Sequence, residues 1–285
     1  MSKRLLVNLL LLVVVAILAA IAIYEPGIEK SKAEAVLTDI YPDAVNEIVI
    51  EQPDAKRIRL LKEDSGWQLE EPIAARANSF RIDSLLQIAR AKSYASYPVQ
   101  GMDLPRYELQ PPKGQVSLNG TVIRFGGTEP IEHRRYVLVN DRVHLIADSH
   151  YYQSQLTLPA LVDNALVPPG RTLRALHLPG VEIQHLSDGK WKASGDKQKV
   201  SMDDINIMLD EWRQARALDV SAYENDSAIG QIRLDFTDGS SLTYELLSNG
   251  PDWILGRRDI GMRYHLSETE AGQLWLSGHM PDSGT

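Results

Sequence analysis

The chain has 285 residues, a formal net charge of −8 and no cysteine. This length allows one large domain or two ordinary ones. Its 44% hydrophobic and 24% charged residues are typical of a folded protein rather than a disordered one. The absence of cysteine excludes disulfides, thiolate metal sites and cysteine nucleophiles, and the acidic balance argues against a nucleic-acid partner, which would require a basic face.

A hydrophobic N-terminal segment is the first recognisable feature. Lys3 and Arg4 precede an apolar run from Leu5 to Ile23, which ends at Tyr24. A helix over this run would be roughly 28 Å long, close to the thickness of a bilayer core. Because positive residues stay in the cytoplasm and tyrosine favours the membrane interface, residues 1–24 are predicted to form a transmembrane anchor.

A cleaved signal peptide is the alternative interpretation of this segment. Ala20-Ile21-Ala22 resembles a cleavage site, and the charged start fits this interpretation as well. Under either interpretation the remainder of the chain is exported, and residues 25–35 form a polar stalk.

Residues 36–168 are predicted to form a first α+β module. Strands are expected at 45–50, at 57–61 and from Trp67 to Glu71-Pro72. A helix should follow a cap at Asn78-Ser79, because the next apolar residues have i, i+3, i+4, i+7 spacing. These residues are Ile82, Leu85, Leu86 and Ala89. Tyr97-Pro98 is expected to close this unit.

Two hairpins and a short helix complete the first module. Asn119-Gly120 lies between the runs 115–118 and 121–125, which is the strongest short hairpin signal. The second hairpin joins 135–139 to 143–146, and Asp148-Ser149 is expected to cap the short helix.

Residues 169–285 repeat this order of elements. A strand is predicted at 181–186 and another from Trp191, with Asp188-Gly189 as the turn. Ser201 to Asp204 resembles a capping box, and the helix after it has Ile205, Met208, Leu209 and Trp212 on one face. Two hairpins at 231–246 and 253–266 follow, and the capping box Ser267 to Glu270 starts a last short helix.

The repeated order predicts an internal duplication. Trp67 aligns with Trp191, Leu85 with Met208, Leu86 with Leu209, and His144 with His265. The spacing of roughly 115 to 125 residues is too long for a solenoid repeat and indicates two domains. The fold class is therefore predicted as α+β: two tandem homologous modules of mostly antiparallel sheet, each with one main packing helix, after an N-terminal transmembrane helix. The modules are expected at 36–168 and 169–285, divided at Pro168-Pro169-Gly170.

Repetition at one structural position favours burial, so the shared positions are candidates for the core. If exposed, the tryptophans could instead stack on sugar rings or on a partner. The core candidates are Trp67, Pro72, Leu85, Leu86, Trp191, Met208, Leu209 and Trp212.

Several motifs of the first module resemble a known family. They are Val45 to Ile50, Gly66 to Pro72, Asp83 to Leu86, Tyr107 to Pro112 and the segment Phe125-Gly-Gly-Thr-Glu-Pro130 before Tyr136. This combination is similar to that of bacterial single-pass envelope proteins with the domain of unknown function DUF4340. Glu108 stands where members often have glycine, and the second module resembles the family less.

The resemblance implies a location and a kind of role, but no catalytic residues. Family members look like envelope components, and some resemble proteins encoded beside ABC transporters of the gliding type. The expected location is the bacterial inner membrane, crossed once, with most of the chain in the periplasm. The expected partners are this membrane and other envelope proteins, among them an ABC transporter.

No motif in the sequence indicates an enzyme. The chain has no G-x-S-x-G elbow, P-loop, G-x-G-x-x-G or H-E-x-x-H, so no catalytic, cofactor or metal residue and no cofactor is assigned. His144 and His150, with Asp148 between them, are more typical of structural positions than of a metal site, which needs three or four ligands. The carboxylate pairs Asp203-Asp204 and Glu268 with Glu270 suit first helical turns.

Two basic clusters remain as candidate partner contacts, namely Arg134-Arg135 and Arg257-Arg258. The alternative is that they protect sheet edges against pairing.

Three functional hypotheses follow. The first is a non-enzymatic interaction module, accessory to an envelope complex such as a transporter. The second is a periplasmic protein that binds a glycan, lipid or small molecule in the cleft between the modules. The third is a periplasmic hydrolase, which would require Ser, His and Asp to converge in one cleft.

Overall fold

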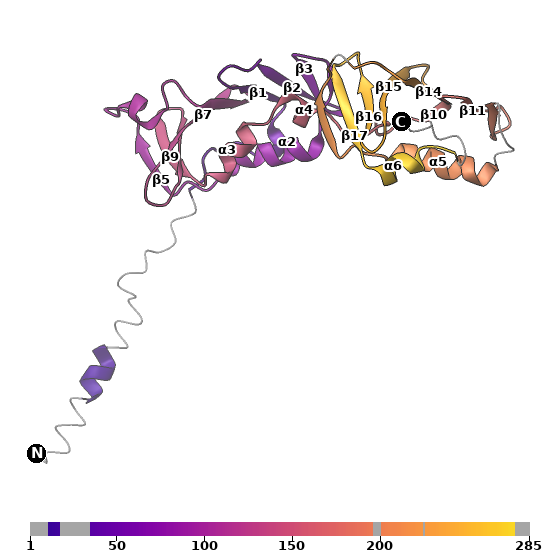
Figure 1. Ribbon diagram of the computed structural model, residues 1–285. Coiled ribbons are helices and arrows are strands. Elements are labelled where there is room, and N and C mark those ends of the chain that lie inside the picture. The colour runs from indigo at the N-terminus through magenta and orange to yellow at the C-terminus, as the bar shows by residue number, and fades with distance from the viewer. Residues whose placement is uncertain (1–10, 18–34, 196–200, 225, 277–285) are drawn as a thin grey trace, which may run out of the picture.

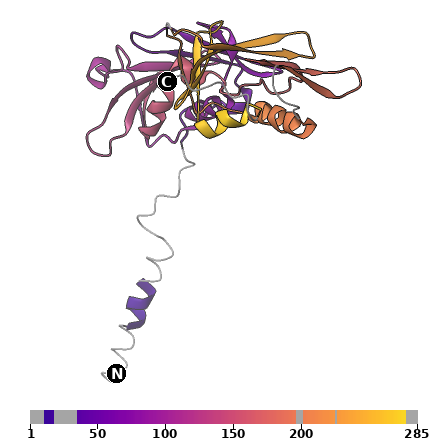
Figure 2. The same cartoon turned by 45° about the vertical axis from the view of Figure 1, so that its right-hand side comes forward.

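The computed structural model describes residues 11–17, 35–195, 201–224 and 226–276. These residues form two antiparallel sheets of nine and eight strands (Figure 1). The helices lie along one face of the two sheets, which the turned view shows as well (Figure 2). The expectation of mostly antiparallel sheets with a few packing helices is confirmed, and the fold is mainly β.

The first sheet contains the strands of residues 47–146, which we call the first module together with the adjoining helices. Its strands are β1 (Glu47–Glu51), β2 (Ile58–Glu63), β3 (Gly66–Glu71), β4 (Ala75–Arg76), β5 (Ala95–Pro98), β6 (Gly114–Leu118), β7 (Thr121–Thr128), β8 (Arg135–Val139) and β9 (Arg142–Ile146). Their order across the sheet is β4-β3-β2-β1-β6-β7-β8-β9-β5.

The second sheet contains the strands of residues 173–266, the second module. Its strands are β10 (Leu173–Leu178), β11 (Val181–His185), β12 (Trp191–Gly195), β13 (Asp219–Ala222), β14 (Gly230–Phe236), β15 (Ser241–Asn249), β16 (Trp253–Arg257) and β17 (Met262–Leu266). Their order is β12-β11-β10-β14-β15-β16-β17-β13. With the two-residue strand β4 set aside, the two sheets have the same strand order.

The helices occupy corresponding places in the two modules. The first module has α2 (Ser79–Leu86), α3 (Ser149–Ser154), α4 (Leu158–Leu161) and the 3₁₀ segments η1 (Pro42–Ala44), η2 (Gln87–Arg90) and η3 (Leu104–Tyr107); the second has α5 (Met202–Gln214) and α6 (Glu268–Gln273). The main helix α2 follows the short strand β4, and α5 follows β12, which is the counterpart of β3. The helices α3 and α6 each follow the last hairpin of their module.

Most of the predicted helix caps are present. Asn78 and Ser201 accept hydrogen bonds from the backbone N–H three residues on, and Ser267 with Glu270 forms the expected capping box. The expectation for Asp148 is wrong, because its side chain makes no cap hydrogen bond. Its carboxylate instead pairs with Arg135 at 2.6 Å.

Both predicted hairpins of the first module are confirmed. Asn119 and Gly120 take φ values of 48° and 84°, the left-handed pair that a two-residue I′ turn requires. The Asn119 carboxamide also accepts from the backbone N–H groups of Asn46 and Glu47 at 2.9 and 3.1 Å. The turn residue therefore also ties the hairpin to the start of β1.

Four strands were not expected from the sequence, among them the two-residue strand β4. β10 lies at the centre of the second sheet between β11 and β14, at the position of β1 in the first. β5 and β13 are short strands that pair with β9 and β17 at the rim. Tyr97-Pro98, which was expected to close the helical unit, therefore forms the end of strand β5.

The alignment of His144 with His265 is also wrong, by one residue. β9 ends with the core residue Ile146 and β17 with the core residue Leu266. His144 therefore corresponds to Tyr264, and His265 lies on the opposite face of its sheet. Alternate residues of a strand point to opposite faces, so a slip of one residue exchanges them.

The anchor prediction concerns residues outside this description. Lys3, Arg4, Leu5, Ile23, Tyr24 and stalk residues 25–34 lie outside the described ranges, whereas residues 11–17 are helical and exposed. Within the described ranges, no helix is both long and apolar enough to cross a bilayer.

Candidate functional site

Six of the eight core candidates are buried. Trp67, Leu85, Leu86, Met208, Leu209 and Trp212 are all less than 9% exposed. Trp191 is only partly buried, because it opens the edge strand β12 and stacks edge-on against His185. Pro72 is exposed, so its prediction as a core residue is wrong; it follows the last residue of β3 and borders a surface pocket.

The four candidate contact arginines all have partners within the chain. Arg135 is buried, bonds Asp148 and the Gly126 carbonyl, and stacks on Tyr151, so it is not available to a partner. Arg134 pairs with Glu132, Arg257 with Asp259, and Arg258 with Glu245.

The edge-protection alternative for these arginines is wrong as well. They flank β8 and β16, which are interior strands of their sheets. Of the four, Arg134 and Arg258 retain accessible side chains, at 25% and 64%.

Two serine–histidine contacts bear on the hydrolase hypothesis. The Ser93 hydroxyl donates to the Ala95 carbonyl, so at 2.9 Å it can only accept from His144 Nδ1, which is the reverse of a nucleophile–base pair. Ser221 Oγ lies 2.8 Å from His265 Nε2. Among the described residues, neither histidine bonds a carboxylate that would orient it as a base.

Metal-binding groups are also dispersed. Within the described residues, no three His, Asp or Glu side chains come together in a way that could hold an ion. His144 is buried, and burial lowers its pKa.

Two of the family-like motifs pack against each other. The segment 99–113, which includes η3, covers the face of the first sheet away from the helices. Leu109 is buried there in a small cluster with Leu138 and Val143. A Cβ on Gly126 would lie 2.4 Å from the Tyr107 carbonyl oxygen, so this contact requires glycine. Glu108 has a φ of 56°, a left-handed conformation that explains a preference for glycine at this position.

The Thr-Glu-Pro part of the same motif shapes the loop between β7 and β8. The Glu129 carboxylate accepts from the backbone N–H groups of Ile131 and Glu132 at 2.9 and 2.6 Å. These hydrogen bonds hold the pKa of the Glu129 carboxyl below its usual range, and the bond from the Ile131 N–H has the largest effect.

The two modules are joined by a segment that pairs with both. On one side, Asn78 N donates to Leu161 O at 2.8 Å and Asp163 N donates to Arg76 O at 2.9 Å. On the other side, Leu166 N donates to Ala215 O at 3.1 Å. The buried Tyr244 hydroxyl donates to the Leu166 carbonyl at 2.7 Å. The connection before Pro168 is therefore part of the structure of both modules, whose buried apolar residues form one continuous cluster.

A cavity of about 400 Å³ lies beside this junction. The first module contributes Ser65, Gln68 and Arg76, and the second contributes Arg171, Phe236, Ser241, Leu242, Arg257 and Asp259, with Pro168 and Pro169 between them. A neighbouring hollow of about 340 Å³ shares Ser241, Leu242 and Asp259. The cavity is within the roughly 300–1,000 Å³ range of ligand pockets, and domain interfaces are a common place for them.

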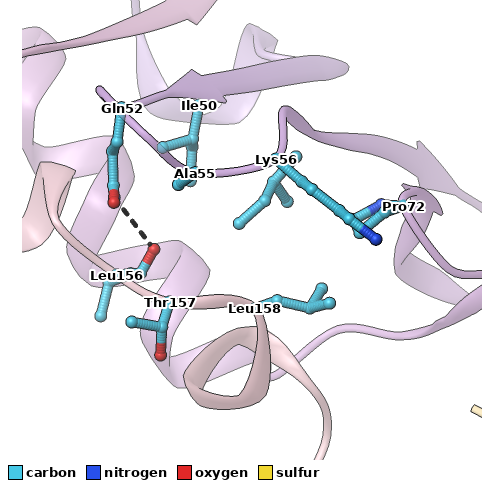
Figure 3. Close-up of a pocket in the computed structure, with 9 residues that line it drawn as sticks. Ile50, Gln52, Ala55, Lys56, Pro72, Leu156, Thr157 and Leu158 are labelled. Carbon is cyan, nitrogen blue, oxygen red and sulfur yellow. Dashed lines mark hydrogen bonds between the residues drawn. The ribbon is translucent and has the colours of Figure 1, made fainter. Parts of the chain in front are cut away.

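A smaller pocket of about 210 Å³ lies on the first module, between the loop after β1 and the start of α4 (Figure 3). Its lining is mainly apolar: Ile50, Ala55, Ile58, Pro72, Leu156 and Leu158, with Gln52, Lys56 and Thr157. Gln52 Nε2 donates to the Leu156 carbonyl at 3.2 Å, which ties the two loops together across the pocket (Figure 3). Among the described residues, Lys56 has no ion-pair or hydrogen-bond partner.

A cleft between the modules was one hypothesis from the sequence, but no motif indicated the residues that line either cavity. Arg76, Arg171 and Arg257 are far apart in the chain and lie in no common motif. Lys56 lies in the loop between β1 and β2, and the sequence of this loop is typical of an exposed turn. Only the topology brings these groups together.

Comparisons with known proteins agree with the family resemblance. Residues 67–235 match the model of DUF4340, a domain of unknown function. No curated protein and no solved structure matches the chain. The family match starts in β3 and ends in β14, so it spans the junction and not one module alone.

Proposed function

Since the chain belongs to the DUF4340 family, whose domain has no known function, we propose that it is a non-enzymatic interaction module held at the extracytoplasmic side of a bacterial inner membrane. In this proposal it serves as an accessory or scaffolding component of an envelope complex, such as a gliding-type ABC transporter. The apolar run Leu5 to Ile23 supports the tether. The shared strand order of the two sheets supports an origin by duplication, with two tandem homologous modules.

The observation that carries the interaction role is the pocket beside Lys56. At about 210 Å³ it is smaller than pockets that enclose a whole ligand. Its size suits one large apolar side chain, and such anchor pockets dominate the energy of protein interfaces. The unpaired ammonium at its rim adds a preference for an acidic group next to that anchor.

The test is in-cell crosslinking of the tagged full chain, followed by mass spectrometry of what co-purifies. Ala55→Trp fills the pocket and Lys56→Glu reverses its charge; both positions are exposed, so the fold should tolerate both changes. Lys192→Glu is the matched control, since it makes the same charge change on the exposed face of β12. We expect a membrane-protein partner with wild type and the control, and at least a tenfold loss with the two pocket variants.

Two outcomes would count against this function. Equal recovery of the partner with all four proteins would exclude the pocket as the contact. No partner above an anchor-only control would oppose the interaction role itself. Tethering is tested separately: full replacement of the native protein by an exported version without residues 1–24 would refute the need for an anchor.

The second candidate function is binding of a glycan, lipid or small molecule between the modules. The junction cavity favours it, because both modules contribute to its lining and its volume of about 400 Å³ suits a small ligand.

A further inference from the structure

Three arginines from different parts of the chain line the junction cavity. Arg76 comes from β4, Arg171 from the connection before β10, and Arg257 from the end of β16. Asp259 is the one carboxylate among the described lining residues. The side chains that line the cavity therefore carry three positive charges and one negative charge, and Asp163 and Asp238, which are outside the lining, each pair with one of the arginines.

The partners of these arginines leave donors for a ligand. Arg76 Nε lies 3.0 Å from Asp163. Arg171 Nη1 donates to the Ser240 hydroxyl and lies 3.7 Å from Asp238, and no hydrogen bond from its Nε or Nη2 is seen among the described residues. Only Arg257 holds its carboxylate with two hydrogen bonds, of 2.8 and 2.6 Å to Asp259. A guanidinium has five N–H donors in a planar fork, and this geometry matches phosphate and carboxylate groups.

The rest of the lining has a polar part, formed by Ser65, Gln68 and Ser241, and an apolar part. Leu242, Pro168 and Pro169 line the cavity with Phe236, and the Arg171 guanidinium lies 5.3 Å from the centre of the Phe236 ring. An inorganic ion would use only the cationic part of this surface. A ligand with both an acidic and an apolar part would use the cationic and the apolar parts together.

We propose that the junction cavity binds a small organic anion, with a phosphate or carboxylate held by Arg76 and Arg171 and an apolar group against Leu242 and the two prolines. This proposal rests on the second candidate function, ligand binding between the modules, and adds the chemical class. Because the lining residues come from both modules, the bound anion bridges them and stabilises the junction.

Phenyl phosphate is a suitable probe, because it combines a phosphate with an apolar ring. Its dissociation constant is measured by calorimetry on the detergent-purified full chain, with benzyl alcohol as the neutral comparison. Arg171→Gln removes a cation whose side chain is 42% exposed, so the fold should be retained. Arg174→Gln is the matched control, three residues on and outside the cavity lining.

We expect saturable binding of one phenyl phosphate, at least tenfold weaker with Arg171→Gln and within twofold of wild type with Arg174→Gln. Competition by dihexanoyl phosphatidylglycerol would identify a lipid headgroup as the source of the anion. If this lipid does not compete, the source is a soluble phosphate ester. Equal binding of benzyl alcohol and phenyl phosphate would overturn the anion class and leave ligand binding intact. Binding of neither compound would overturn both.

Discussion

The sharpest test of the packing described above is the substitution Gly126→Ala. The added Cβ would lie 2.4 Å from the Tyr107 carbonyl oxygen and 2.9 Å from the Leu109 side chain. Neither can move without lifting segment 99–113 from the first sheet, because Leu109 is only 2% exposed. Overpacking of this kind costs about 1–3 kcal/mol. At about 2–4 °C per kcal/mol, the melting temperature should fall by roughly 2–12 °C.

The assay is thermal unfolding followed by circular dichroism, with tryptic cleavage as a local measurement. Displacement of the segment should speed cleavage after Arg106, which lies within it. Gly114→Ala is the matched control in β6, because the one close contact of its Cβ, at 2.8 Å, is with the end of the flexible Gln155 side chain, which can swing away. The next contact, with the Glu51 carbonyl oxygen at 3.7 Å, is an ordinary van der Waals distance. Unchanged melting and cleavage for Gly126→Ala, or an equal effect of Gly114→Ala, would refute this account of the packing.

Three further predictions concern charge and titration. Arg135→Ala should lower the free energy of unfolding, measured with urea, by about 2–3 kcal/mol, because it leaves the partly exposed Asp148 without its buried partner. Arg134→Ala removes a more exposed ion pair and should lower it by under about 1 kcal/mol, so similar losses for the two variants would contradict the prediction. Burial raises the pKa of Tyr264 to about 12, so its stabilising contribution is complete below about pH 10 and is lost as the pH rises towards 12. Tyr264→Phe should flatten the fall in unfolding free energy between about pH 10 and 12, and an unchanged slope there would count against this interpretation. Burial lowers the pKa of His144, so its contribution to the stability of the fold is present above about pH 6.5 and is lost as the pH falls through the lower pKa of the folded state. A titration midpoint of this imidazole at or above pH 6.5, measured by NMR, would show the interpretation to be wrong.

The sequence predicted those parts of the fold that local chemistry determines. Asn119-Gly120 specified its hairpin because few residues other than asparagine and glycine accept two successive left-handed conformations. Ser267 and Glu270 specified a helix start because their side chains satisfy the free backbone N–H groups of the first turn. Helix faces such as that of Met208, Leu209 and Trp212 follow from periodicity alone.

The errors arose where the determining contact is distant in sequence. Leu173–Leu178 has no clear alternation, and it becomes a central strand because β11 and β14 offer it hydrogen bonds on both sides. β5 ends in a proline and gains its strand character from β9, about 45 residues further along the chain. The same holds for the candidate sites, because the lining of each cavity comes from separate loops whose meeting depends on the assembled topology.

The two modules treat the open faces of their sheets differently, and this bears on what each one does. In the first module the connection 99–113 between β5 and β6 covers that face and buries Leu138 and Val143. The corresponding connection between β13 and β14 in the second module is shorter, and charged side chains lie on the equivalent face of the sheet. Arg258 bonds Glu245 there, and His177 and Arg233 both bond Asp235. An apolar segment covers this face in the first module, whereas a network of hydrogen-bonded charged side chains lies on the equivalent face in the second. The proposed duplication was therefore followed by divergence. The junction is then the surface that needs both modules, which is why the arginine-lined cavity there is the place to look for a ligand of the whole chain.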